Sequence, residues 1–139
     1  MEDRPSTVNT MRYSHTSITV RSIDDSLRFY TEVLGLEPAG RRRIEENRAE
    51  IAFVRDPSTG ARIELTHWDG KDRIEPGEQL DHIAFEVEDL DAVLARAKER
   101  GARVGKEPYR LKGRTSRIAF LIDSDEVWIE LIEPARAPA

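Results

Sequence analysis

The chain contains two copies of one pattern, and this internal repeat constrains its fold more than any other feature of the sequence. Each copy opens with a histidine at the start of an alternating segment, His15 in the first and His82 in the second. Each closes with an Ile-Glu-Leu triplet, whose glutamate follows the histidine by 49 residues at Glu64 and by 48 residues at Glu130. Because the matching segments recur in the same order, the chain is expected to fold as two similar units.

Each copy predicts one strand, one helix and three further strands, which is a βαβββ unit. The segment after each histidine alternates between apolar and polar side chains, and this is the period of a strand. A helix is expected between the N-cap Ser22 and Gly35, and its counterpart from about Leu90 to Arg100. The further strands are expected near Glu37–Ile44, Ala49–Arg55 and Ala61–His67, and near Arg103–Glu107, Ser116–Asp123 and Val127–Ile132.

Length and composition predict a single domain of the α+β class. A chain of 139 residues suits one core, expected over residues 12–134 as units 12–68 and 80–134, with disordered tails at 1–11 and 135–139. The net charge of −5 argues against binding to nucleic acid or to a membrane surface. No membrane-spanning run or signal peptide is recognisable, so a cytoplasmic location is expected. The absence of cysteine excludes thiolate ligands and cysteine nucleophiles.

The strand period places four side chains on the same kind of sheet face. The apolar face of each sheet must pack against its helix to form the core. His15, Glu64, His82 and Glu130 therefore lie on the opposite face of their strands. Taken singly, such a histidine is usually structural and such a glutamate is usually a surface residue. Taken together, two imidazoles and two carboxylates suit a divalent nickel, cobalt, zinc, manganese or iron ion. Positions left free for water or substrate are typical of a catalytic metal site.

These residues resemble the vicinal oxygen chelate superfamily, and within it bacterial glyoxalase I (lactoylglutathione lyase). The resemblance covers roughly Arg12 to Pro134 and is carried by Ser26–Tyr30 with Val33–Gly35, Arg62–Thr66, His82–Phe85 and Ile129–Glu133. It implies an α+β fold in which eight strands form a curled mixed sheet around the metal. In this family the site commonly lies at a homodimer interface, with ligands drawn from both subunits.

The resemblance also implies a reaction and a cofactor. The substrate would be the hemithioacetal of a 2-oxoaldehyde, methylglyoxal, and a small thiol. The metal ligands would be His15, Glu64, His82 and Glu130, with nickel or cobalt favoured and zinc possible. Glu130 would remove the C1 proton, leaving an enediolate, and Glu64 could share this role because it is the equivalent residue of the other copy.

The substrate-binding part departs from the family pattern. Thr19 stands where bacterial glyoxalase I usually has an arginine, and a family asparagine after the second ligand is missing. Lys112 matches a basic position of the family, and Arg114 lies beside it. We therefore expect Lys112, Arg114, Thr19 and Trp68 to contact the substrate, with the thiol left open.

Two alternative functions remain. One is an epimerase or another lyase that acts on a different substrate, such as a CoA thioester; Glu64 counts against it, because such members typically have glutamine there. The other is a metal-free protein that sequesters a drug or metabolite, as in bleomycin resistance. Four potential ligands on one kind of face count against that alternative.

Overall fold

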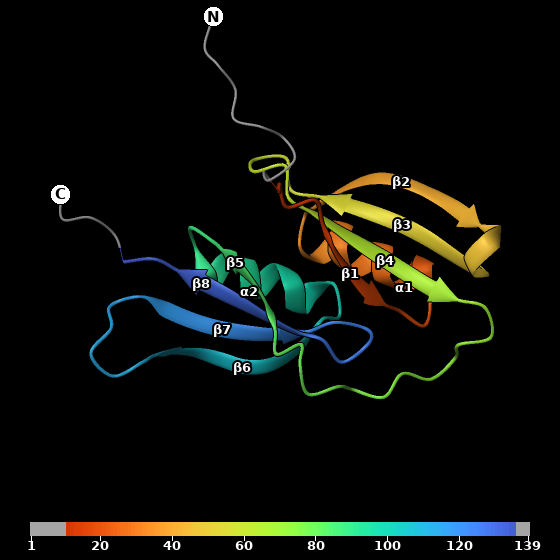
Figure 1. The fold of residues 1–139 in the computed structure, drawn as a ribbon. Coiled ribbons are helices and arrows are strands. Elements are labelled where there is room, and N and C mark those ends of the chain that lie inside the picture. The colour runs from red at the N-terminus through yellow and green to blue at the C-terminus, as the bar shows by residue number, and fades with distance from the viewer. Residues whose placement is uncertain (1–10, 136–139) are drawn as a thin grey trace, which may run out of the picture.

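Both repeats fold into the predicted unit, and the computed structural model describes residues 11–135 (Figure 1). The tails predicted at 1–11 and 135–139 lie outside these residues except for Met11 and Ala135. The sheet of the first unit has, in spatial order, β1 (Thr16–Thr19), β4 (Arg62–Trp68), β3 (Ala49–Arg55) and β2 (Glu37–Ile44). The sheet of the second has β5 (Ile83–Glu86), β8 (Trp128–Glu133), β7 (Arg117–Ile122) and β6 (Arg103–Arg110). A 3-10 turn, η2 (Glu45–Asn47), joins β2 to β3.

The α+β class is confirmed, but the eight strands do not form one curled sheet within this chain. Within each unit the first strand pairs in parallel with the fourth, and the other neighbours are antiparallel. In the described residues no ladder joins the two sheets, which lie beside each other, each with its helix on one face (Figure 1). The outer edges of the short strands β1 and β5 therefore end the sheets.

The second helix, α2 (Leu90–Glu99), begins and ends where the sequence predicts. The carboxylate of Asp89 caps it by accepting the backbone N–H of Ala92 at 3.1 Å. Gly101 follows with a φ of +81°, a left-handed conformation that glycine adopts without a Cβ clash. No helix in the described part of the chain is long and apolar enough to cross a membrane.

The first helix departs from the prediction in its last turns. Ser22 caps α1 (Ile23–Arg28) as expected, but Phe29–Val33 (η1) is π-helical. The carbonyl of Phe29 accepts the backbone N–H five residues further on at 3.1 Å. Phe29, Tyr30 and Val33 are buried in this segment, and together with Ser26 they keep the i, i+3, i+4, i+7 spacing of an ordinary helix. Hydrophobic spacing alone does not reveal this change.

The core lies between each sheet and its helix, and the opposite sheet face stays open. Leu65 of β4 and Ile129 of β8 are fully buried beneath the helices. The side chains of Glu64 and Glu130, their neighbours in sequence, remain 19% and 16% exposed. Since successive side chains in a strand point to opposite faces, both glutamates lie on the open face.

A buried polar network connects the two units. The hydroxyl of Tyr30 donates to Oδ2 of Asp123 at 2.7 Å, and the hydroxyl of Ser26 donates to Oδ2 of Asp125 at 3.3 Å. Nε of Arg21 donates to Oδ1 of Asp125 at 2.9 Å. Arg21, Ser26 and Tyr30 belong to the first unit, whereas both aspartates belong to the turn between β7 and β8. Burial raises the pKa of Asp123.

Candidate active site

The first predicted pair, His15 and Glu64, meets on the open face of the first sheet. Nε2 of His15 lies 3.8 Å from Oε2 of Glu64. Glu64 stands opposite Phe53 in the β3–β4 register, and the rings of His15 and Phe53 meet edge-on with their centroids 5.1 Å apart. The hydroxyl of Thr66 donates to Oε1 of Glu64 at 3.2 Å, and the hydroxyl of Ser14 lies 2.8 Å from Nδ1 of His15. Neighbouring side chains thus orient both members of the pair.

The second predicted pair, His82 and Glu130, has the same construction on the second sheet. Nε2 of His82 lies 3.1 Å from Oε1 of Glu130, and Nδ1 lies 2.7 Å from Oδ1 of Asp81. The ring of Phe120 meets the His82 ring edge-on at 5.9 Å, as Phe53 does in the first unit. The hydrogen bond to Asp81, and then the charge of Glu130, raise the pKa of His82.

The two pairs remain apart within the chain. Across residues 11–135, no three histidine, aspartate or glutamate side chains lie close enough to hold one ion. Each pair offers an imidazole nitrogen and a carboxylate oxygen, and this donor chemistry fits a divalent transition ion. A site with four ligands therefore requires that a pair from a first-unit sheet faces a pair from a second-unit sheet.

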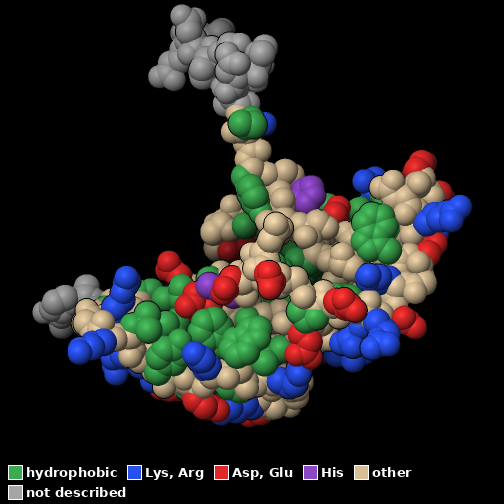
Figure 2. All heavy atoms as spheres, turned by 60° about the horizontal axis from the view of Figure 1, so that its bottom comes forward, with side chains coloured by type: hydrophobic (Ala, Val, Ile, Leu, Met, Phe, Trp, Pro, Cys, Tyr) green, Lys and Arg blue, Asp and Glu red, His purple; other side chains and the backbone are tan. Residues whose placement is uncertain are grey.

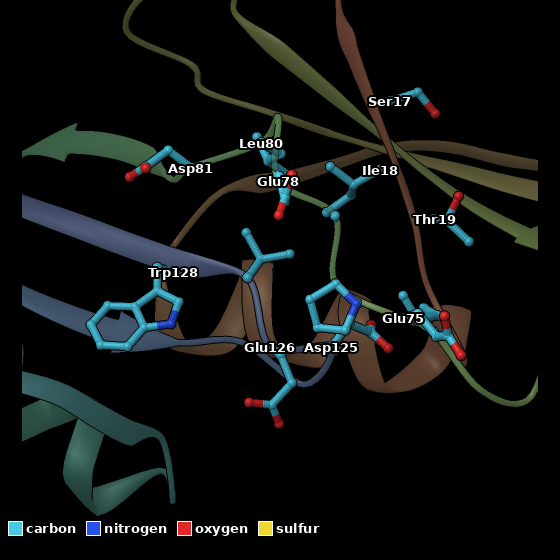
Figure 3. Close-up of a pocket in the computed structure, with 14 residues that line it drawn as sticks. Ser17, Ile18, Thr19, Glu75, Glu78, Leu80, Asp81, Asp125, Glu126 and Trp128 are labelled. Carbon is cyan, nitrogen blue, oxygen red and sulfur yellow. The ribbon is translucent and has the colours of Figure 1, made fainter.

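Thr19 lies in an acidic groove between the first strand and the β7–β8 turn (Figure 3). The groove measures about 580 Å³ and also contains Trp128. Its carboxylates are those of Glu75, Glu78, Asp81, Asp125 and Glu126, and none of the described residues that line it is lysine or arginine. Arg21 pairs with Asp125 at 2.9 Å and Arg103 pairs with Glu126 at 2.7 Å, but Glu75 and Glu78 have no ion pair with a described residue, so the groove disfavours an anionic ligand.

A second groove, of about 720 Å³, runs between the start of β4 and strand β5. Arg62 lines it from the first unit, and His82 lines it from the second. The guanidinium of Arg62 lies over the ring of Phe53, 3.9 Å from the ring centroid. This groove thus brings a cation from one unit near a histidine of the other.

Comparison with known proteins identifies the family. A family model described as the Glyoxalase/Bleomycin resistance protein/Dioxygenase superfamily matches residues 12–131. The chain belongs to this superfamily. Among its relatives, a probable lactoylglutathione lyase of Vibrio parahaemolyticus is 39% identical over 130 residues, which cover 92% of this chain and 94% of the relative.

Solved structures of the superfamily share the fold. Glyoxalase I from Zea mays superposes with a TM-score of 0.82 at 29% identity, covering 91% of this chain. The chain spans about half the length of that maize protein, 46%. A trypanothione-dependent glyoxalase I from Leishmania major superposes with a TM-score of 0.76 at 28% identity, covering 89% of this chain and 87% of its own. These matches confirm the fold that the sequence predicted.

The other residues expected to bind substrate lie away from both grooves. Lys112 and Arg114 are exposed in the loop between β6 and β7. Trp68 ends β4 with 41% of its surface exposed, and it lines neither groove. None of the contacts of the four pair residues in the described part of the chain involves Lys112, Arg114 or Trp68.

Sequence reasoning missed an aromatic wall beside the second pair. The rings of Phe120 and Trp128 lie 5.5 Å apart, and Tyr109 and Lys106 complete a small pocket next to them. Hydrophobic side chains cover much of this side of the second unit (Figure 2). The two repeats contain a signal for part of this wall. Trp128 stands two residues before Glu130, and therefore on the same sheet face, as Arg62 stands two residues before Glu64.

Proposed function

We propose that this chain is a metal-dependent lyase of the glyoxalase I type. It isomerises the hemithioacetal of a 2-oxoaldehyde and a thiol to a 2-hydroxyacyl thioester, as in methylglyoxal detoxification, and acts in the cytoplasm. The observation that carries the proposal is the pair of matching histidine–glutamate contacts, at 3.8 Å and 3.1 Å, on equivalent strands of the two repeats. Relatives named lactoylglutathione lyase support the reaction class.

The proposed metal ligands are His15, Glu64, His82 and Glu130. In both pairs Nδ1 of the histidine is engaged by the preceding residue, so Nε2 is left to bind an ion beside the glutamate. A bound divalent ion, nickel or cobalt in preference to zinc, would polarise the substrate oxygens and stabilise developing negative charge. Because the pairs stay apart in one chain, the site forms between two copies, with one pair from each.

Glu130 is the proposed general base. It takes the proton from C1 of the hemithioacetal and returns it at C2, so the reaction is an isomerisation without loss of atoms. Glu64 is less suited to this role, because it accepts a hydrogen bond from Thr66. Its carboxylate is thereby held in one orientation, whereas Glu130 makes a polar contact only with His82 among the described side chains.

The test is turnover of the methylglyoxal–glutathione hemithioacetal by protein stripped of metal and reloaded with nickel, cobalt or zinc. Thioester absorbance follows the reaction, and calorimetry counts the ions bound. Metal-dependent turnover is expected, with nickel or cobalt ahead of zinc. Stoichiometric binding without turnover would exclude this substrate, and failure to bind any of the three ions would overturn the metal site.

The proposal also includes the residues predicted to contact the substrate. Lys112 and Arg114 reach the ligand only if their exposed loop faces the site in the two-chain assembly. Thr19 and Trp68 carry no charge, so they contribute shape rather than anion binding. Replacing Lys112 by methionine tests the loop: a higher KM is expected, with kcat unchanged.

A further inference from the structure

Arg62 is the half-buried cation that the fold leaves without an acidic partner. Among the lysines and arginines in residues 11–135, only Arg62 and Arg117 are half-buried, whereas the rest are exposed. Arg117 is paired with Glu133 at 3.0 Å and with Asp91 at 3.0 Å. The side chain of Arg62 has no hydrogen bond or ion pair with any described residue. Since removing a guanidinium from water is costly, an unpaired arginine at this depth points to a missing ligand.

The surroundings of Arg62 orient its guanidinium without using its hydrogen-bond donors. Its contact with Phe53 is face-on, 3.9 Å from the centroid, so the ring supports the cation through cation–π attraction. The five N–H groups at the edge of the guanidinium therefore stay available. A carboxylate matches this edge with two parallel hydrogen bonds.

Arg62 stands close to the proposed metal ligands. It lies two residues before Glu64 on β4 and on the same open face, so their Cα atoms are about 7 Å apart by the rise of a strand. The Phe53 ring that supports Arg62 also meets the ring of His15 at 5.1 Å. A ligand bound at Glu64 and His15 can thus reach Arg62 with a group several bonds from its reacting carbon.

The residue that faces Arg62 across the sheet is another cation. Arg55 stands directly opposite it in the β3–β4 register, an arrangement of like charges that costs stability. Two carboxylates also line the groove, and neither forms an ion pair with Arg62; that of Asp56 stays ionised and accepts hydrogen bonds from Ser58 and Thr59, which lower its pKa. The other, Glu86, is exposed on β5.

We propose that Arg62 binds a carboxylate of the thiol portion of the substrate, and that it is thereby a specificity-determining residue. This inference rests on the proposed lyase function and deepens it. The substrate class is the hemithioacetal of a small acidic thiol, whose carboxylate lies several bonds from the sulfur. Arg62 supplies the anion recognition that the acidic groove around Thr19 does not.

The test compares Arg62→Met, Arg62→Lys and the charge-matched control Arg42→Met, whose native side chain is exposed on β2 and does not line the groove. Each variant is assayed on the methylglyoxal adduct of glutathione and on the adduct of glutathione diethyl ester, which lacks carboxylates. Arg62→Met is expected to raise KM for the free acid roughly ten- to a hundredfold, since a charge-assisted bond is lost. Its kcat, and its KM for the diester, stay unchanged.

Arg62→Lys should recover part of the loss, because it keeps the charge but not the two-pronged geometry. Equal losses on acid and diester, or an equal effect of Arg42→Met, would overturn the role of Arg62. Calorimetry with unreactive S-methylglutathione separates the two proposals. If Arg62→Met binds S-methylglutathione more weakly and the control does not, the role of Arg62 is supported, whether or not the proteins are active. If neither the parent nor any variant turns the substrate over, the proposed lyase function is wrong. Absence of S-methylglutathione binding to the parent protein would overturn the inference.

Discussion

Each histidine of the candidate site is oriented by the residue just before it in the chain. Ser14 contacts Nδ1 of His15, and Asp81 contacts Nδ1 of His82, so both rings direct Nε2 toward a glutamate. The asymmetry between a hydroxyl and a carboxylate has a consequence: the charge of Asp81 increases the basicity of its imidazole. If both pairs bind an ion as proposed, the second pair would therefore donate to it more strongly than the first.

At the residue scale, replacing Glu130 by glutamine should lower kcat about a hundred- to ten-thousandfold, because the general base is lost. Metal affinity should fall much less, since an amide oxygen still coordinates. Steady-state kinetics and metal titration measure the two effects. Glu107→Gln, on the exposed side of β6, serves as the control and should be neutral. Near-normal turnover by Glu130→Gln would remove Glu130 from the reaction.

The observed helices and strands agree with the sequence prediction where local patterns determine their bounds. Strands β2 and β3 have the predicted bounds, Glu37–Ile44 and Ala49–Arg55, and Ser22 and Asp89 cap the helices as expected. The π-helical end of the first helix was not predicted, because its buried residues keep the spacing of an ordinary α-helix and the sequence pattern is the same for both.

Strand β6 contains a close approach that only the structure reveals. A Cβ added at Gly105 would lie 2.7 Å from Cζ3 of Trp128, closer than side chains tolerate. Glycine at this position therefore lets the Trp128 ring lie flat against β6 and next to Phe120. The aromatic wall beside the second pair depends on it.

At the element scale, Gly105→Ala should displace the Trp128 ring and lower the free energy of unfolding by about 1–3 kcal/mol. Urea denaturation measures the loss, and the tryptophan emission maximum should shift as the ring moves. Gly77→Ala provides the control, because nothing lies within 4 Å of a Cβ built there. Equal stability of the two variants would show that the ring adjusts without cost.

At the scale of the whole molecule, the two units are connected through the buried turn that carries Asp123 and Asp125. Tyr30 reaches across from the first helix to Asp123, a contact between residues 93 positions apart. Because burial raises the pKa of Asp123, its folded state holds a proton at pH values where the unfolded chain has lost it. The contribution of this group to stability therefore falls as the pH rises from about 4, near the unfolded pKa, through the raised folded pKa.

The prediction compares Asp123→Asn with the parent protein over this range of pH. The unfolding free energy of the parent, relative to the variant, should be highest near pH 4 and should decrease toward neutrality. Asparagine can still accept hydrogen bonds from Tyr30 and from the backbone, so the comparison isolates the charge. Urea denaturation at several pH values measures it, and parallel pH profiles for the two proteins would contradict the buried-charge explanation.

The proposed assembly from two copies also has a test at this scale. His15→Ala and His82→Ala should each be inactive, but mixing them should restore about a quarter of the parent activity. Random exchange makes half of the dimers mixed, and each mixed dimer carries one intact site of two. Turnover after refolding the mixture measures this. If each site lay within a single chain, the mixture would stay inactive, because every chain would lack one ligand.

The repeat, the βαβββ unit, the approximate bounds of the elements and the sheet faces of His15, Glu64, His82 and Glu130 could all be predicted from the sequence alone. These features follow from local periodicity and capping, which neighbouring residues settle between themselves. Only the tertiary structure showed that the ligand pairs stay apart in one chain, that Arg62 rests unpaired on Phe53, and that Tyr30 meets Asp123. Such contacts depend on strand register and on how two sheets pack, so residues far apart in sequence decide them and no local pattern records them.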